Sequence, residues 1–88
     1  MFDKEELWAH IVDNECLLAD GFDDAVIGMT FGSVAKTVYS VHKCLEILTK
    51  DEEMTMDDAV EYFEYNVAGS YVGEKTPIFV YDYLPNYV

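Results

Sequence analysis

The stretch Met54–Val80 constrains the fold most, because it combines a capped helix, a glycine turn and a strand that a proline introduces. Thr55 is a typical N-cap, and an acidic residue follows three positions later. Apolar residues then recur at helical spacing and predict one buried face: Met56, Ala59, Val60, Phe63 and Val67. We expect this helix to end by Gly69, in the left-handed backbone conformation that glycine adopts easily. The run Ile78–Tyr81 has side chains typical of a strand.

Two further helices are expected earlier in the chain. Asp3 is the expected N-cap of an amphipathic helix that ends at Leu18 or Ala19. Ser40 is the expected N-cap of a second helix over residues 41–50, whose apolar side chains share one face.

Between these helices the charge almost vanishes, and the pattern predicts strands over residues 26–31 and 34–39 with a hairpin turn at Gly32-Ser33. With 88 residues, the chain is expected to form a single domain, residues 1–88. The order α-β-β-α-α-β predicts an α+β fold: a small antiparallel three-stranded sheet with helices packed on one face. A mostly helical bundle with a small hairpin is the alternative.

The acidic charge restricts the partners that this chain can have. There are 18 acidic residues against 5 basic ones, which gives a formal net charge of -13. Nucleic acids and anionic membranes should repel such a chain, so we expect no direct nucleic-acid binding and no membrane association. A basic protein is the partner that the charge favours. The alternative is that the acidity only keeps the protein soluble.

The same sequence favours a cytoplasmic protein. No apolar run is long enough for a membrane span, and the first residues lack the features of a secretory signal. Cys16 and Cys44 are expected to be buried, reduced thiols, although a single disulfide between them is left open.

Catalysis, metal binding and cofactor binding have little support in the sequence. The loop Gly69–Thr76 resembles a phosphate loop, but Glu74 stands where that motif requires glycine, and the loop follows a helix instead of preceding one. The histidines and cysteines lack the spacing of a zinc site. No serine or cysteine has both a base and a group that orients that base nearby in the sequence. We therefore expect neither an enzyme nor a cofactor.

An acidic stripe on the helix that follows Thr55 is the candidate binding surface. Asp57, Glu61 and Glu64 recur at spacings of four and three and share one helix face, which Tyr62 and Tyr65 flank. Tyrosine serves protein interfaces well. The preceding acidic link adds three more candidates: Asp51, Glu52 and Glu53. The alternative is a solvated helix face with no partner.

Three pieces of the chain carry a resemblance to a known group of proteins: DAVIG (24–28), VYSVHKCLEIL (38–48) and MTMDDAVEYFEYNVAGSYVGEKTPIFV (54–80). They resemble the pattern of short uncharacterised proteins of tailed phages. The resemblance implies a phage origin and action on a host protein inside a bacterial cell. It assigns no activity to any residue.

Two hypotheses on function follow. The first is a small acidic phage-type protein that binds and inhibits a basic, nucleic-acid-handling host protein, such as a CRISPR or restriction complex, by nucleic-acid mimicry. The second is a small homodimeric structural or accessory phage protein whose acidity serves solubility alone. Both place the protein in the cytoplasm of the host cell.

Overall fold

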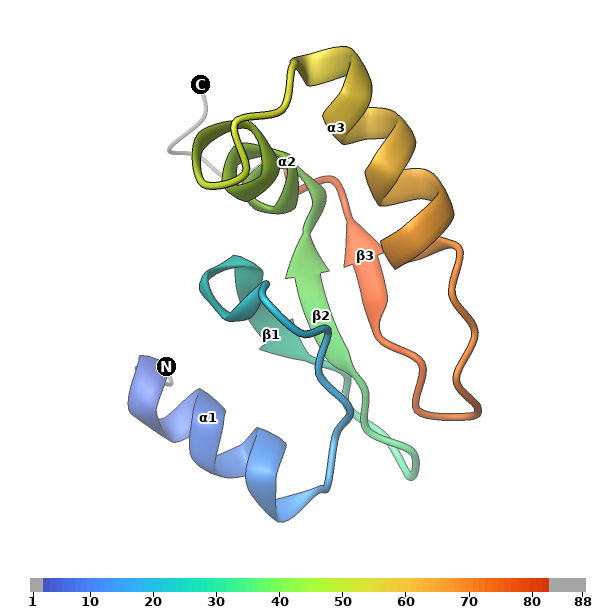
Figure 1. The fold of residues 1–88 in the computed structure, drawn as a ribbon. Helices are drawn as coiled ribbons and strands as arrows, with labels where there is room; N and C mark the ends of the chain where they lie inside the picture. Colours follow the sequence, from blue (N-terminus) through green and yellow to red (C-terminus); the bar gives the residue numbers. More distant parts are fainter. Residues whose placement is uncertain (1–2, 83–88) are drawn as a thin grey trace.

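The computed structural model describes residues 3–82, which form an α+β fold with three α-helices and a three-stranded sheet (Figure 1). The helices and strands follow one another as expected, but a 3₁₀ turn and a π-helix are added, so the full order differs from the predicted one. The elements are α1 (Lys4–Asp13), η1 (Asp23–Ala25, 3₁₀), β1 (Val26–Met29), β2 (Thr37–Ser40), α2 (Val41–Lys50), α3 (Met56–Tyr62), η2 (Phe63–Ala68, π) and β3 (Ile78–Val80). No helix in this range is long and apolar enough to cross a membrane.

The sheet is mixed, and the prediction of an antiparallel sheet is wrong. β2 lies in the centre; β1 pairs with it antiparallel, whereas β3 pairs with it parallel, so that Tyr39 lies next to Phe79. The connection from β2 to β3 passes through α2 and α3, and a loop then returns the chain to the starting end of β2 (Figure 1). A connection this long permits either strand direction, whereas a tight turn permits only the antiparallel one.

The core lies on the side of the sheet that carries Tyr39 and Phe79. Their rings stack with centroids 5.2 Å apart, and the ring of Phe63 meets that of Phe79 edge-on at 5.2 Å. The prediction that Phe63 belongs to the core is confirmed, whereas Met56, expected on the same buried face, is exposed. All three helices contribute to the buried cluster: Ile11, Phe22, Ala25, Val26, Tyr39, Val41, Cys44, Leu48, Ala59 and Phe63.

α1 is shorter than expected, because tertiary hydrogen bonds hold the following segment, residues 14–22, in another path. The hydroxyl of Thr37 donates to the carbonyl oxygen of Leu17 at 2.8 Å. The hydroxyl oxygen of Tyr39 accepts a hydrogen bond from the backbone N–H of Ala19 at 2.6 Å. The segment therefore runs across the sheet instead of continuing the helix as predicted (Figure 1).

The three predicted N-caps are confirmed. Asp3, Ser40 and Thr55 cap α1, α2 and α3. In each case the side-chain oxygen accepts a hydrogen bond from the backbone N–H three residues later, which satisfies a donor that the helix itself leaves unpaired. These local signals set where each helix begins.

Candidate protein-binding surface

The acidic residues of α3 and η2 are exposed to solvent. Asp57, Glu61 and Glu64 are all exposed, and none of them forms an ion pair with another of the described residues. Tyr62 and Tyr65 are exposed as well, at 41% and 77% of their surface. The chain itself therefore leaves these negative charges and aromatic rings accessible to a partner.

The last turns of this helix, Phe63–Ala68, form a π-helix that contains Glu64. In η2 the hydrogen bonds span five residues, so each turn is wider than in an α-helix. Glu64 belongs to η2, whereas Asp57 and Glu61 belong to α3, and Glu64 does not line the hollow that contains Glu61. Gly69 has a φ of -80° and not the left-handed conformation that we expected. A glycine is still required there, because a Cβ atom would lie 2.6 Å from the carbonyl oxygen of Glu64.

A shallow hollow on α3 and η2 brings together part of the predicted set. The hollow measures about 330 Å³, and three predicted residues line it: Glu61, Tyr62 and Tyr65. Three residues that the sequence analysis missed complete the lining: Met54, Asp58 and Asn66. Asp58 precedes Glu61 by three positions, a spacing that puts two side chains on one helix face and could have identified it. We call this feature the acidic hollow.

The acidic link between α2 and α3 contributes less than expected. Asp51, Glu52 and Glu53 are exposed, but none of them lines the acidic hollow. Asp51 lies in a separate hollow that contains two lysines, Lys43 and Lys50, and two further acidic residues, Asp24 and Glu46. The candidate binding surface is therefore the acidic hollow and not the acidic stripe of Asp57, Glu61 and Glu64.

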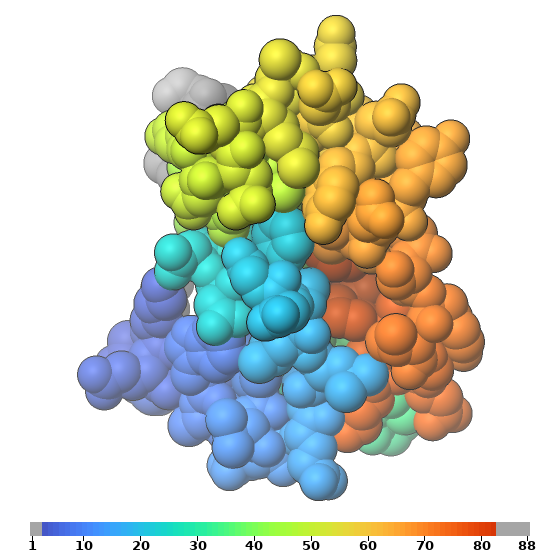
Figure 2. All heavy atoms as spheres, viewed as in Figure 1, coloured from blue at the N-terminus to red at the C-terminus, as the bar shows by residue number. Residues whose placement is uncertain are grey.

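A hydrophobic groove of about 420 Å³ adjoins the acidic hollow, and the two share Tyr62 and Asn66. Figure 2 shows it as an indentation between the blue-to-cyan segment 14–22 and the orange surface that follows α3, with the red atoms of β3 deeper inside. Its lining is mostly apolar: Leu17, Leu18, Ala19, Asp20, Phe22, Tyr62, Asn66, Val67, Ser70, Val72, Pro77 and Phe79. The sequence analysis missed this hydrophobic groove because its walls come from segments that are far apart in the chain.

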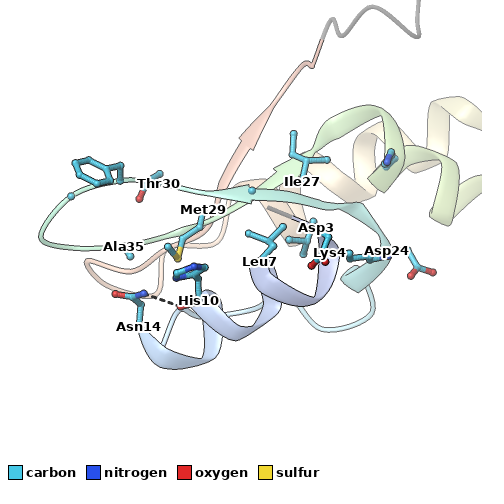
Figure 3. Close-up of a pocket in the computed structure, with 15 residues that line it drawn as sticks. Asp3, Lys4, Leu7, His10, Asn14, Asp24, Ile27, Met29, Thr30 and Ala35 are labelled. Atoms are coloured by element: carbon cyan, nitrogen blue, oxygen red, sulfur yellow. Dashed lines mark hydrogen bonds between the residues drawn. The ribbon is translucent and has the colours of Figure 1, made fainter. Parts of the chain in front are cut away.

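A further groove, of about 1040 Å³, lies between α1 and β1 (Figure 3). Leu7 and Met29 make its walls apolar, and His10 lies beside them. Much of its polar lining serves the fold: Asp3 caps α1, and the amide of Asn14 donates to the carbonyl oxygen of His10 at 2.8 Å. No serine or cysteine among the described residues lines it.

The loop that resembles a phosphate loop uses its polar side chains within the protein. Lys75 Nζ donates to the backbone carbonyl oxygens of Asn14 and Glu15 at 2.7 and 3.2 Å. The hydroxyl of Thr76 donates to the carbonyl oxygen of Gly73, whose φ is 107°. Lys75 and Gly73 therefore each have a structural role in this loop that does not involve a phosphate ligand.

The two cysteines are free thiols in different environments. Cys16 is half-buried, whereas Cys44 is buried. Burial raises the pKa of the Cys44 thiol to about 12, so this thiol stays protonated near neutral pH and is a poor nucleophile. Within residues 3–82, no group of three or more histidine, cysteine, aspartate or glutamate side chains is placed to hold a metal ion. That the protein works without a metal or catalytic site stays a prediction.

Comparison of the chain with models of protein families, with curated proteins and with solved structures found no match. The resemblance to tailed-phage proteins therefore stays a prediction. Any argument on function has to come from the surface described above.

Proposed function

We propose that this chain is an acidic interaction protein that binds a basic, nucleic-acid-handling protein of a bacterial host and inhibits it. The observation that supports this best is the surface of α3 and η2. There, carboxylates that form no ion pair with another described residue lie beside exposed tyrosines and a hydrophobic groove. In such a surface the carboxylates steer and select the partner, while the aromatic and apolar side chains supply contact area.

The net charge of -13 extends this preference to the whole molecule. A surface rich in lysine and arginine attracts it, whereas nucleic acids and anionic lipids repel it. Proteins that handle nucleic acids carry such surfaces, because they bind phosphates. Inhibition follows if the carboxylates occupy the positions of those phosphates. The partner that fits the phage resemblance is a defence system such as a CRISPR or restriction complex in the host cytoplasm.

Charge reversal in the acidic hollow tests the proposal. The double variant Asp58→Lys/Glu61→Lys places positive charge where the partner is expected to be positive. Its matched control is Glu5→Lys/Glu6→Lys on α1, which changes the net charge equally and also alters the first turn of a helix. Proteins captured from bacterial lysate by the wild type should bind the α3 variant at least roughly tenfold more weakly than the α1 control. They should also lose nucleic-acid binding when the wild type is added.

Equal loss of affinity in both double variants would mean that only the net charge of the protein matters for binding. It would contradict a specific role for α3. Circular dichroism confirms that each variant remains folded. Affinity that is unchanged at high salt would also contradict the proposal, because exposed charge pairs are screened by salt.

The homodimeric accessory protein is the second candidate, and the exposed apolar residues around the hydrophobic groove favour it. Two copies with a charge of -13 each repel one another at low salt, so the dimer should form best at high salt. Sedimentation velocity at two salt concentrations separates the candidates. A dimer that strengthens with salt supports the second candidate, and a monomer at both salts supports the first.

A further inference from the structure

Four exposed large apolar side chains of the described residues line the hydrophobic groove, whereas others, such as Val12, Phe31 and Met56, lie outside it. Leu17 and Leu18 lie on one side of it, and Tyr62 and Val72 lie on the other, and each of them is more than a third exposed. Scattered single apolar residues are normal on a protein surface, but a group around one concave site indicates a binding surface. A groove of about 420 Å³ is within the range of about 300–1,000 Å³ of sites that bind apolar groups.

The base of the groove is fixed before any partner binds. Phe79 lies in the lining, and its ring is held between Tyr39, stacked at 5.2 Å, and Phe63, edge-on at 5.2 Å. Pro77 restricts the chain beside it. A site with a rigid aromatic base loses little conformational entropy when an apolar side chain enters it.

The two walls of the groove are segment 14–22 and the stretch from η2 to Pro77, and neither of them is a strand. In segment 14–22, Leu17 and Ala19 already direct backbone hydrogen bonds to side chains of β2. The opposite wall is helical at Tyr62, Asn66 and Val67. Beyond the helix, the backbone N–H groups of Ser70 and Val72 donate to the carbonyl oxygen of Val67 and to Thr76 Oγ1. An extended peptide would find few backbone partners here. A helix satisfies its own backbone and can insert apolar side chains, so a helix fits this groove better.

The charge around the groove selects a basic partner. Asp20 lies on the segment wall, and the acidic hollow with Asp58 and Glu61 begins where the groove ends, at Tyr62 and Asn66. No lysine among the described residues lines either feature. Lysine or arginine side chains that flank an apolar stripe would therefore meet carboxylates on both sides.

We propose that the hydrophobic groove binds an amphipathic basic helix of the partner protein, whose apolar side chains insert against Phe79 while its cationic side chains face Asp20, Asp58 and Glu61. The proposal rests on the proposed function, because the acidic hollow supplies its charge complementarity. Charge complementarity alone requires only a basic ligand, whereas binding in the groove also requires apolar side chains on one face of that ligand.

A synthetic peptide tests this directly. The probe is a fluorescein-labelled helix of about 18 residues made of leucine and lysine, with leucines at positions i, i+3, i+4 and i+7. The comparison peptide has the same composition in an order that distributes the leucines around the helix. Fluorescence anisotropy should show that the wild-type protein binds the amphipathic peptide roughly tenfold or more tightly than the scrambled one. Equal affinity for the two peptides overturns the proposal.

A pair of matched variants locates the site. Val72→Asp puts a carboxylate at the groove, and Val12→Asp makes the same change on α1, outside the groove lining; the two valines are 57% and 69% exposed. Both variants become more acidic, so electrostatics alone predicts equal or tighter binding of the peptide. A carboxylate against inserted apolar side chains instead costs affinity, and Val72→Asp should bind roughly tenfold more weakly than Val12→Asp.

The outcomes separate the two proposals. If Val72→Asp and Val12→Asp bind the amphipathic peptide equally, the groove is not its site, and the proposed function stands on the acidic hollow alone. If Asp58→Lys/Glu61→Lys has no effect on partner affinity, the proposed function fails whatever the peptide does. If sedimentation shows a wild-type dimer that Val72→Asp dissociates, and the peptide does not bind, the occupant is a second copy of this chain and the proposal is overturned.

Discussion

The hydroxyl of Ser40 donates a hydrogen bond to Asp82 Oδ1 at 2.6 Å and, with the same oxygen, accepts one from the backbone N–H of Lys43. Ser40 is fully buried, and Asp82 is 7% exposed. One side chain therefore caps α2 and connects the end of β2 to the residues after β3. The negative charge of Asp82 is also close to the N-terminus of α2, where the helix dipole favours it.

Ser40→Ala should destabilise the protein by about 2–4 kcal/mol, because it removes a helix cap and a hydrogen bond to a buried carboxylate together. Urea unfolding measures the change in the free energy of unfolding. The control is Thr55→Ala, which removes only the capping bond of α3 at an exposed site and should cost about 1 kcal/mol. Equal losses in the two variants would show that the contact with Asp82 contributes nothing.

Tyr39→Phe should loosen the segment 14–22. The tyrosine hydroxyl oxygen accepts the hydrogen bond of the Ala19 N–H, and phenylalanine keeps the stacking on Phe79 while it removes that acceptor. We expect a loss of about 1–3 kcal/mol in the free energy of unfolding, as for a donor left without its partner. Hydrogen exchange at the Ala19 amide should become faster in the variant. Unchanged exchange at this amide would mean that other contacts hold the segment.

Phe63→Ala should cost about 3–5 kcal/mol, because Phe63 is 5% exposed and packs edge-on against Phe79. In a chain of 88 residues this is a large part of the total stability. Chemical denaturation measures the loss. Met56→Ala is a useful comparison, since Met56 is 55% exposed on the same helix and should change stability by well under about 1 kcal/mol. Similar losses in the two variants would contradict the described packing of α3.

Alkaline pH should destabilise the fold through Cys44. Burial raises the pKa of its thiol to about 12, above its ordinary value of 9.0, so the folded state binds a proton that the unfolded state has released between these values. The stabilisation is complete below pH 9 and decreases as the pH rises toward 12, by on the order of a few kcal/mol. Burial also raises the pKa of Tyr39, which acts in the same direction.

The test compares the slope of unfolding free energy against pH in the wild type and in Cys44→Ala. The variant should be less stable at neutral pH because of the cavity, but its slope above pH 9 should be smaller. Alkylation gives an independent readout: at pH 8 the native protein should react at Cys16 well before Cys44. Parallel slopes, or equal alkylation of both thiols, would contradict this assignment.

Local signals in the sequence determined where the helices begin and part of their buried faces, although Met56, expected on the buried face of α3, is exposed. Asp3, Ser40 and Thr55 cap helices because their side-chain oxygens reach backbone donors three residues away, an interaction that needs no other part of the chain. Phe63 is buried because it lies at the centre of an apolar helix face. Part of the candidate site was also predictable, because Glu61, Tyr62 and Tyr65 are close in sequence and lie on one helix.

Only the tertiary structure decided where α1 ends, which way β3 runs and where the hydrophobic groove lies. α1 ends early because two side chains of β2, which is remote in sequence, form hydrogen bonds with the backbone of Leu17 and Ala19. These bonds replace the ones that a further helical turn would form. β3 runs parallel to β2 because the connection through α2 and α3 returns the chain to the starting end of β2. The groove exists only once segment 14–22, η2 and β3 meet. Each of these features depends on contacts between distant residues, and no local pattern in a single sequence encodes such contacts.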